Sequence, residues 1–131
     1  MTLRRLWHLI GLALLAATVW GSLGPPPDSP LRFPFEDKAW HLLAYFCLAG
    51  WYGMLRPADR RWRWRVAVAC ALLGLLLEGL QHFVPGRLPD LGDALANTGG
   101  ALLGLLWARS RAGRLLERLE RLTAGSGDTR R

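Results

Sequence analysis

The sequence predicts an all-α fold, a bundle of four transmembrane helices with both termini in the cytoplasm. Three observations predict it: 51% of the residues are hydrophobic, four long apolar segments follow one another, and the basic residues gather in alternate connections between them. Helices that are apolar on every side need lipid or protein around them. A chain of 131 residues is too short to surround four such helices with polar partners, so we favour a membrane bundle over a soluble one.

The four apolar segments comprise residues 6–24, 39–55, 66–84 and 91–108. Their lengths are close to the minimum that crosses a hydrocarbon core of about 30 Å. The second and fourth segments are less apolar because they contain polar residues. The alternative to four spans is therefore a chain with three spans and one re-entrant segment. For the first segment the alternative is a cleaved signal peptide, but bulky Trp20 and the absence of a small-residue cleavage pattern favour a retained helix.

The orientation follows from the distribution of Arg and Lys. Fourteen of the seventeen basic residues lie in the N-terminal segment, in residues 56–65 and after residue 108, whereas the other side has only Arg32, Lys38 and Arg87. Short loops rich in Arg and Lys stay in the cytoplasm. We therefore expect a multi-pass membrane protein with both termini in the cytoplasm and two connections outside.

The connections and the tail have their own signals. Residues 25–38 contain five prolines and should be extended, and residues 85–90 should form a tight turn that makes the third and fourth helices antiparallel neighbours. We divide the chain into a transmembrane domain, residues 1–108, and a cytoplasmic tail, residues 109–131. Within the tail, residues 111–122 predict a basic amphipathic helix suited to an anionic membrane surface, and the end should be disordered. The alternative is a solvated helix without a membrane role.

The net charge of +7 could suggest nucleic acid, but the basic residues follow the loop pattern, and Trp62 and Trp64 are typical of the membrane interface. We therefore expect no nucleic-acid partner. Cys47 and Cys70 both fall in apolar segments, at depths that differ by roughly 9 Å. We expect two buried free thiols.

Polar residues within the last three apolar segments form one stripe on each helix. Helical spacing places Asp37, His41 and Tyr45 on one face of the second helix. It likewise places Glu78 and Gln81 on one face of the third helix, and Asp90, Asp93 and Asn97 on one face of the fourth. At about 1.5 Å per residue, Tyr45, Glu78 and Asn97 lie roughly 9 Å below the outer boundary. Because polar groups in lipid need partners or water, we expect these residues, with Lys38 and Arg87, to line a polar pocket that opens outward.

Glycines continue the same stripes. Gly74 lies one turn before Glu78, and Gly100 and Gly104 follow Asn97 in a small-xxx-small pattern. Small residues allow close approach of membrane helices. We predict that the three glycines pack the helices beneath the polar layer.

The order and spacing of these residues resemble the VanZ-like family of small bacterial membrane proteins. The resemblance rests on Asp37-Lys38, His41 and Tyr45, then Glu78 and Gln81, then a third motif, and covers about half of the chain. The third motif consists of Arg87, Asp90, Asp93, Asn97 and Gly100. The resemblance implies an envelope protein of the bacterial inner membrane, since the family is named for a protein linked to low-level teicoplanin resistance.

Three hypotheses follow for the pocket. We favour a non-enzymatic role, in which it binds an envelope lipid, a cell-wall precursor or a partner and affects glycopeptide susceptibility. The second is a membrane enzyme acting on a lipid-linked or phosphate-bearing substrate, with His41 as acid or base, or with His41, Glu78 and Asp93 as metal ligands. The third is a structural role as an assembly factor. We assign no catalytic residue, metal or cofactor, and the sequence leaves the ligand and the oligomeric state open.

Overall fold

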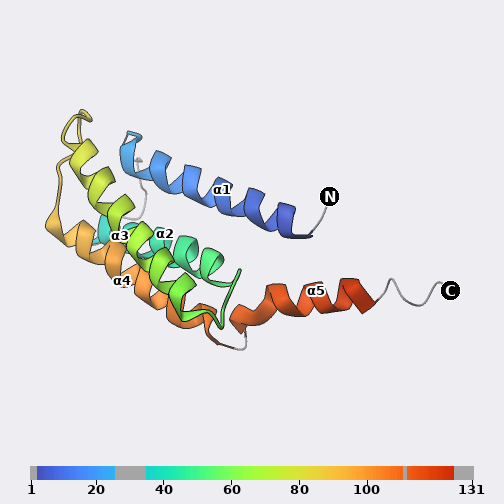
Figure 1. Cartoon of the computed structure of the whole chain (residues 1–131). Coiled ribbons are helices and arrows are strands. Elements are labelled where there is room, and N and C mark those ends of the chain that lie inside the picture. Colours follow the sequence, from blue (N-terminus) through green and yellow to red (C-terminus); the bar gives the residue numbers. More distant parts are fainter. Residues whose placement is uncertain (1–2, 26–34, 111, 126–131) are drawn as a thin grey trace.

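The computed structural model describes residues 3–25, 35–110 and 112–125, which contain helices and no β-strand. The elements are α1 (Leu3–Leu23), α2 (Glu36–Gly53), α3 (Arg60–Gln81), α4 (Leu91–Ala108), the 3₁₀-helix η1 (Ala112–Arg114) and α5 (Leu115–Gly125). Figure 1 shows α1 to α4 side by side as a bundle, with α5 projecting from one end. The predicted all-α class is confirmed.

The helices differ from their predicted bounds mainly at α3. This helix begins at Arg60 and ends at Gln81, whereas residues 66–84 were predicted. The Asp59 carboxylate accepts a hydrogen bond from the backbone N–H of Trp62 over 3.1 Å, so it caps the first turn. Arginine is a good helix former, and the basic stretch predicted as a loop therefore forms the first turns of α3.

The other bounds shift less. α1 begins and ends slightly before the predicted 6–24, and α2 begins at Glu36 and ends at Gly53 rather than spanning residues 39–55. α4 has the predicted bounds, 91–108. α1 and α3 are each long and apolar enough to cross a membrane.

α2 and α4 form the closest helix pair. A Cβ atom built on Gly100 would lie 2.1 Å from the backbone oxygen of Leu42, and one on Gly104 would lie 2.3 Å from that of Phe46. Only glycine fits where two helix backbones approach so closely. Gly74 has a related role on α3, since its Cβ would lie 3.2 Å from the Asn97 side-chain amide nitrogen. The three glycines thus set the spacing around the buried polar residues.

Two apolar clusters complete the bundle. One cluster joins the middle parts of the helices and includes Tyr45, Leu48 and Leu105. The other joins the start of α1 to the ends of α2 and α4 and includes Trp7, which stacks on Trp51 with ring centroids 4.1 Å apart. The Trp51 indole N–H also donates to the Trp7 carbonyl over 2.9 Å. These contacts fix the N-terminal half of α1 against α2.

The tail helix docks on this second cluster. Leu116 is only 1% exposed among the residues that include Trp7 and Ala108, and Leu119 packs against the same cluster. The Arg4 guanidinium lies 2.7 Å from the Glu120 carboxylate and links α1 to α5. The tail is therefore helical over Leu115–Gly125, and η1 replaces the first turn of the helix predicted for 111–122. Its placement on a membrane surface remains a prediction.

Two expectations concern segments outside the described residues: most of the extended connection 25–38, and the end of the tail at 126–131. The thiols of Cys47 and Cys70 are both free, as predicted. Cys70 is buried, but Cys47 is exposed, and the prediction of a buried thiol there is wrong. Cys47 is two positions from the fully buried Tyr45 and Ala49, about 200° around α2, and so lies on the opposite face of the helix.

Candidate functional site

His41 is the centre of a polar cluster at one end of the bundle. Its side chain is only 7% exposed, and its Nδ1 lies 3.0 Å from the Asn97 amide oxygen on α4. Its Nε2 lies 3.9 Å from a carboxylate oxygen of Asp37 and 3.9 Å from one of Asp93. Asp37 is one helical turn before His41 on α2, whereas Asp93 and Asn97 are one turn apart on α4. The two stripes predicted from spacing therefore face each other here.

Lys38 joins the first turns of α2 and α4. Its ammonium group lies 3.1 Å from a carboxylate oxygen of Asp93, which is only 3% exposed, and also donates to the Asp90 carboxylate. The other Asp90 carboxylate oxygen accepts from the Gly92 N–H over 2.7 Å and caps α4. The hydrogen bonds from Lys38 and Gly92 lower the pKa of Asp90 below its ordinary value. A buried carboxylate is thus compensated by a cation at the rim of the bundle.

α3 contributes two buried polar side chains. Glu78 accepts a hydrogen bond from the backbone N–H of Asp90 over 3.2 Å, and Gln81 donates to the Ser22 carbonyl over 3.1 Å. Among the described residues, the second Glu78 oxygen and the Tyr45 hydroxyl are buried without a hydrogen-bond partner. Buried polar atoms without partners are rare and mark places where a water or ligand group is expected.

Arg87 links the cluster to the C-terminal end of α1. Its guanidinium donates to the carbonyls of Gly21 and Gly24, over 2.6 and 3.3 Å, and lies 3.7 Å from Asp37. The last carbonyls of a helix have no partner within the helix and attract cations. Arg87 and Gln81 therefore hold the end of α1, a contribution that side-chain patterns did not reveal because α1 supplies backbone atoms.

A cavity of about 420 Å³ lies between α1 and α2 beside this cluster. Of the predicted pocket residues, Asp37, His41, Tyr45 and Arg87 line it. The remaining predicted residues, Lys38, Glu78, Gln81, Asp90, Asp93 and Asn97, form the adjoining network instead. Most of the cavity wall is apolar, from side chains of α1 and α2 such as Leu14, Ala17, Leu43 and Ala44. The site thus combines a charged end with a longer apolar wall.

Three residues in this cluster could hold a metal ion. One ligand atom each from Asp37, His41 and Asp93 lie within 4.8 Å of one another. Glu78, which the sequence suggested as a ligand, is outside this group. Arg87 and Lys38 already face two of the three side chains, so a cation would have to compete with both. A single imidazole nitrogen of His41, Nε2, faces both carboxylates, so His41 is placed to act as a general acid or base between them.

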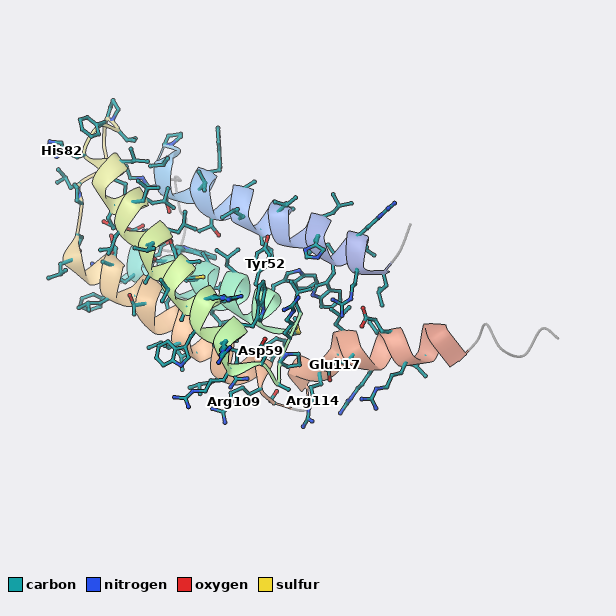
Figure 2. All side chains as sticks on the ribbon, viewed as in Figure 1. Tyr52, Asp59, His82, Arg109, Arg114 and Glu117 are labelled. Atoms are coloured by element: carbon teal, nitrogen blue, oxygen red, sulfur yellow. The ribbon has the colours of Figure 1, made fainter. Side chains whose placement is uncertain are left out.

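In Figure 2, His82 lies at the end of the bundle opposite Asp59 and Arg109. Many large apolar side chains face outward, including Leu72, Leu75 and Leu76 on α3 and Leu95 and Leu106 on α4. An all-helical bundle with an apolar exterior, two helices of membrane-spanning length and a charged network between its helices has the architecture of a small membrane protein.

The chain matches the VanZ/LLP1 family over residues 5–112 and belongs to that family. The match extends well beyond the motifs between Asp37 and Gly100, and it covers α2, α3 and α4 completely and α1 from Arg5. Comparisons with curated proteins and with solved structures return no match.

Proposed function

We propose that this VanZ/LLP1 protein spans the bacterial inner membrane four times, with both termini in the cytoplasm. The basic residues and the outward-facing leucines of α3 and α4 support this arrangement. α2 and α4 are less apolar than α1 and α3, but their polar side chains His41, Asp93 and Asn97 are buried against other helices. Polar residues that face the bundle interior are compatible with a membrane span.

We further propose that the cavity between α1 and α2 binds an envelope lipid or a lipid-linked cell-wall precursor. The observation that carries this proposal is the arrangement of the cavity, with Asp37, His41 and Arg87 at its polar end and an apolar wall beyond them. A lipid has the same division, since its head group is polar and its chain is apolar. The Arg87 guanidinium and the His41 imidazole suit a phosphate or carboxylate, and the apolar wall suits a chain.

Binding of such a lipid would alter the access of glycopeptides to their ligands at the cell surface. This step rests on the family, which the chain matches over residues 5–112. In this role the protein needs no turnover. The ion pair of Arg87 with Asp37 holds the cavity wall in place, and that of Lys38 with Asp93 joins α2 to α4 beside it.

An enzyme acting on a lipid-linked, phosphate-bearing substrate is the second candidate. The close grouping of Asp37, His41 and Asp93 favours it, because the group could bind a metal ion or pass a proton. A structural role, with the network only joining helices, is the third.

The experiment compares four variants in cells and after purification. His41→Ala and Arg87→Gln change the polar end, Ala44→Trp fills the cavity without changing a charge, and His82→Ala is a control at an exposed histidine outside the cavity. Membrane abundance, co-purified lipids and glycopeptide susceptibility are measured for each. We expect the first three variants to keep their abundance but to lose the bound lipid and any change in susceptibility.

Two other outcomes decide between the alternatives. Loss of abundance in His41→Ala and Arg87→Gln, with normal lipid binding in Ala44→Trp, would support the structural role. Conversion of a lipid-linked precursor by the purified protein, abolished in His41→Ala, would support the enzyme. Unchanged lipid content in all variants contradicts the binding proposal.

A further inference from the structure

A second cavity lies at the opposite end of the bundle from the polar cluster. It occupies about 580 Å³ between the start of α3 and the end of α4. Three arginines line it, Arg60 and Arg63 from α3 and Arg109 from the C-cap of α4. In Figure 2, Arg109 lies at the same end of the bundle as Asp59, away from His82. We call this cavity the arginine groove.

Among the described residues, the three arginines of the groove have no acidic partner, although the Arg63 guanidinium donates a hydrogen bond to the Pro57 carbonyl. No ion pair joins Arg60, Arg63 or Arg109 to a carboxylate in the part of the chain that the structure describes. The nearest acid along the chain, Asp59, accepts its hydrogen bonds from the first turn of α3, and its pKa is lowered mainly by the Trp62 N–H. Three like charges around one groove favour an anionic occupant.

The floor of the groove is apolar and open. It contains Ala67 from α3, Leu102 and Leu106 from α4, and the indole of Trp64. Leu102 is 48% exposed and Leu106 58% exposed, and they lie about two turns and one turn before Arg109 on α4. An anion that is soluble in water gains nothing from such a floor, whereas an acyl chain gains about 0.8 kcal/mol for each CH₂ group that it buries.

We propose that the arginine groove binds a phospholipid with an anionic head group. The phosphate would lie among Arg60, Arg63 and Arg109, and one acyl chain would follow Leu102 and Leu106 between α3 and α4. Trp64 belongs at the level of the head groups, where its ring contacts both polar and apolar regions. In the proposed topology this end faces the cytoplasmic leaflet, whose anionic lipids attract basic segments.

This site is separate from the cavity between α1 and α2. It shares no lining residue with that cavity. Failure of either proposal therefore leaves the other standing, and the two can be measured in one protein with different variants. Nucleic acid would fit the arginines, but a leucine floor with a single tryptophan offers few aromatic surfaces on which bases stack.

The test uses the purified full chain in a neutral detergent. Binding of dioleoyl phosphatidylglycerol and of dioleoyl phosphatidylcholine is measured by native mass spectrometry and by the shift in melting temperature. We expect phosphatidylglycerol to bind at least tenfold more tightly. The triple variant Arg60→Gln, Arg63→Gln and Arg109→Gln should weaken phosphatidylglycerol binding by about 10- to 100-fold and remove this preference.

A matched control replaces three exposed arginines outside the groove, Arg5→Gln, Arg61→Gln and Arg114→Gln. It loses the same charge and should keep the preference. Ala67→Phe fills the floor, leaves every arginine in place and should weaken binding of phosphatidylglycerol. This variant keeps the proposal falsifiable if the triple variant does not fold.

Several outcomes would overturn the proposal. Equal losses in the triple variant and in the matched control would show attraction by net charge alone. Competition by glycerol 3-phosphate at the same concentration as the lipid would indicate a site for a soluble phosphate. Tighter binding of a single-stranded oligonucleotide than of phosphatidylglycerol, lost only in the triple variant, would indicate nucleic acid. Normal phosphatidylglycerol binding by a folded Ala67→Phe variant would show that the acyl chain does not lie in the groove.

Discussion

His41 and Asn97 lie 56 positions apart in the sequence, yet their side chains meet in a buried hydrogen bond of 3.0 Å between α2 and α4. Asn97 is 2% exposed, and Gly74 on α3 provides the space beside its amide. The bond couples the orientation of the imidazole to the packing of three helices.

The first prediction concerns this bond. Asn97→Ala leaves the His41 Nδ1 without its partner, and we expect the free energy of unfolding to fall by about 1 kcal/mol, within the range for buried hydrogen bonds in membrane helices. Denaturation of the purified protein in mixed detergent micelles measures it. Thr98→Ala is the control, because its exposed hydroxyl bonds only to the Ala94 carbonyl of its own helix. Equal losses in both variants would contradict the assigned role of the bond.

The second prediction concerns the close contact of α2 with α4. A methyl group at Gly100 would meet the Leu42 backbone oxygen at 2.1 Å, and backbone cannot move aside as a side chain can. Gly100→Ala should therefore reduce stability by about 1–3 kcal/mol. Gly99→Ala is the matched control, since its Cβ would meet nothing within 4 Å. Alanine there should be neutral or stabilise the helix by up to about 1 kcal/mol. Similar stabilities for the two variants would show that the helices separate easily.

Helical spacing and depth were sufficient to predict which parts of α2, α3 and α4 approach one another. His41, Asp93 and Asn97 meet because polar side chains in an apolar bundle are stable only where they find polar partners. The part played by α1 could not be predicted, because Gly21, Ser22 and Gly24 offer only carbonyl oxygens, which every residue has. The last carbonyls of any helix need hydrogen-bond donors, so a partner for the end of α1 could be expected. The sequence does not specify which side chain donates to them.

The start of α3 shows a different limit. The arginines from Arg60 to Arg65 fit both a cytoplasmic loop and a helix end, and their charge was interpreted as a loop. Asp59 decides the matter locally, because its side chain caps the helix. The cavity between α1 and α2 lay beyond prediction for a further reason, since its volume depends on the angle between two helices rather than on any residue pattern.

The third prediction tests the proposed topology. In a background with Cys47→Ala and Cys70→Ala, Leu88→Cys and Ser110→Cys are introduced singly, at an exposed position of the α3–α4 connection and just after α4. With both termini inside, a membrane-impermeant maleimide should label the first in intact cells. It should label the second only after the membrane is opened. The reverse pattern contradicts the orientation, and labelling of both from outside contradicts four spans.

The fourth prediction concerns acid. The Asp90 carboxylate accepts hydrogen bonds from Lys38 and Gly92, and these lower its pKa from the ordinary value of 3.8. Its ionised form is therefore favoured in the folded protein. The resulting stabilisation is complete only about one pH unit above this ordinary value, and it is lost progressively as the pH falls through the lowered pKa. We expect the melting temperature to fall below about pH 5, with Asp59, whose pKa is also lowered, contributing to the same fall.

Two variants separate the Asp90 contribution from that of Asp59. Asp90→Asn retains a good helix cap but cannot titrate, so the fall in melting temperature should become shallower. Lys38→Gln removes the hydrogen bond that lowers the pKa of Asp90 most, so the Asp90 part of the fall should move to higher pH. The Asp59 part should stay in place in both variants, because its partner is the Trp62 N–H at the far end of α3. A melting profile of Lys38→Gln that coincides with that of the unmodified protein would show that Lys38 does not hold the Asp90 carboxylate in solution.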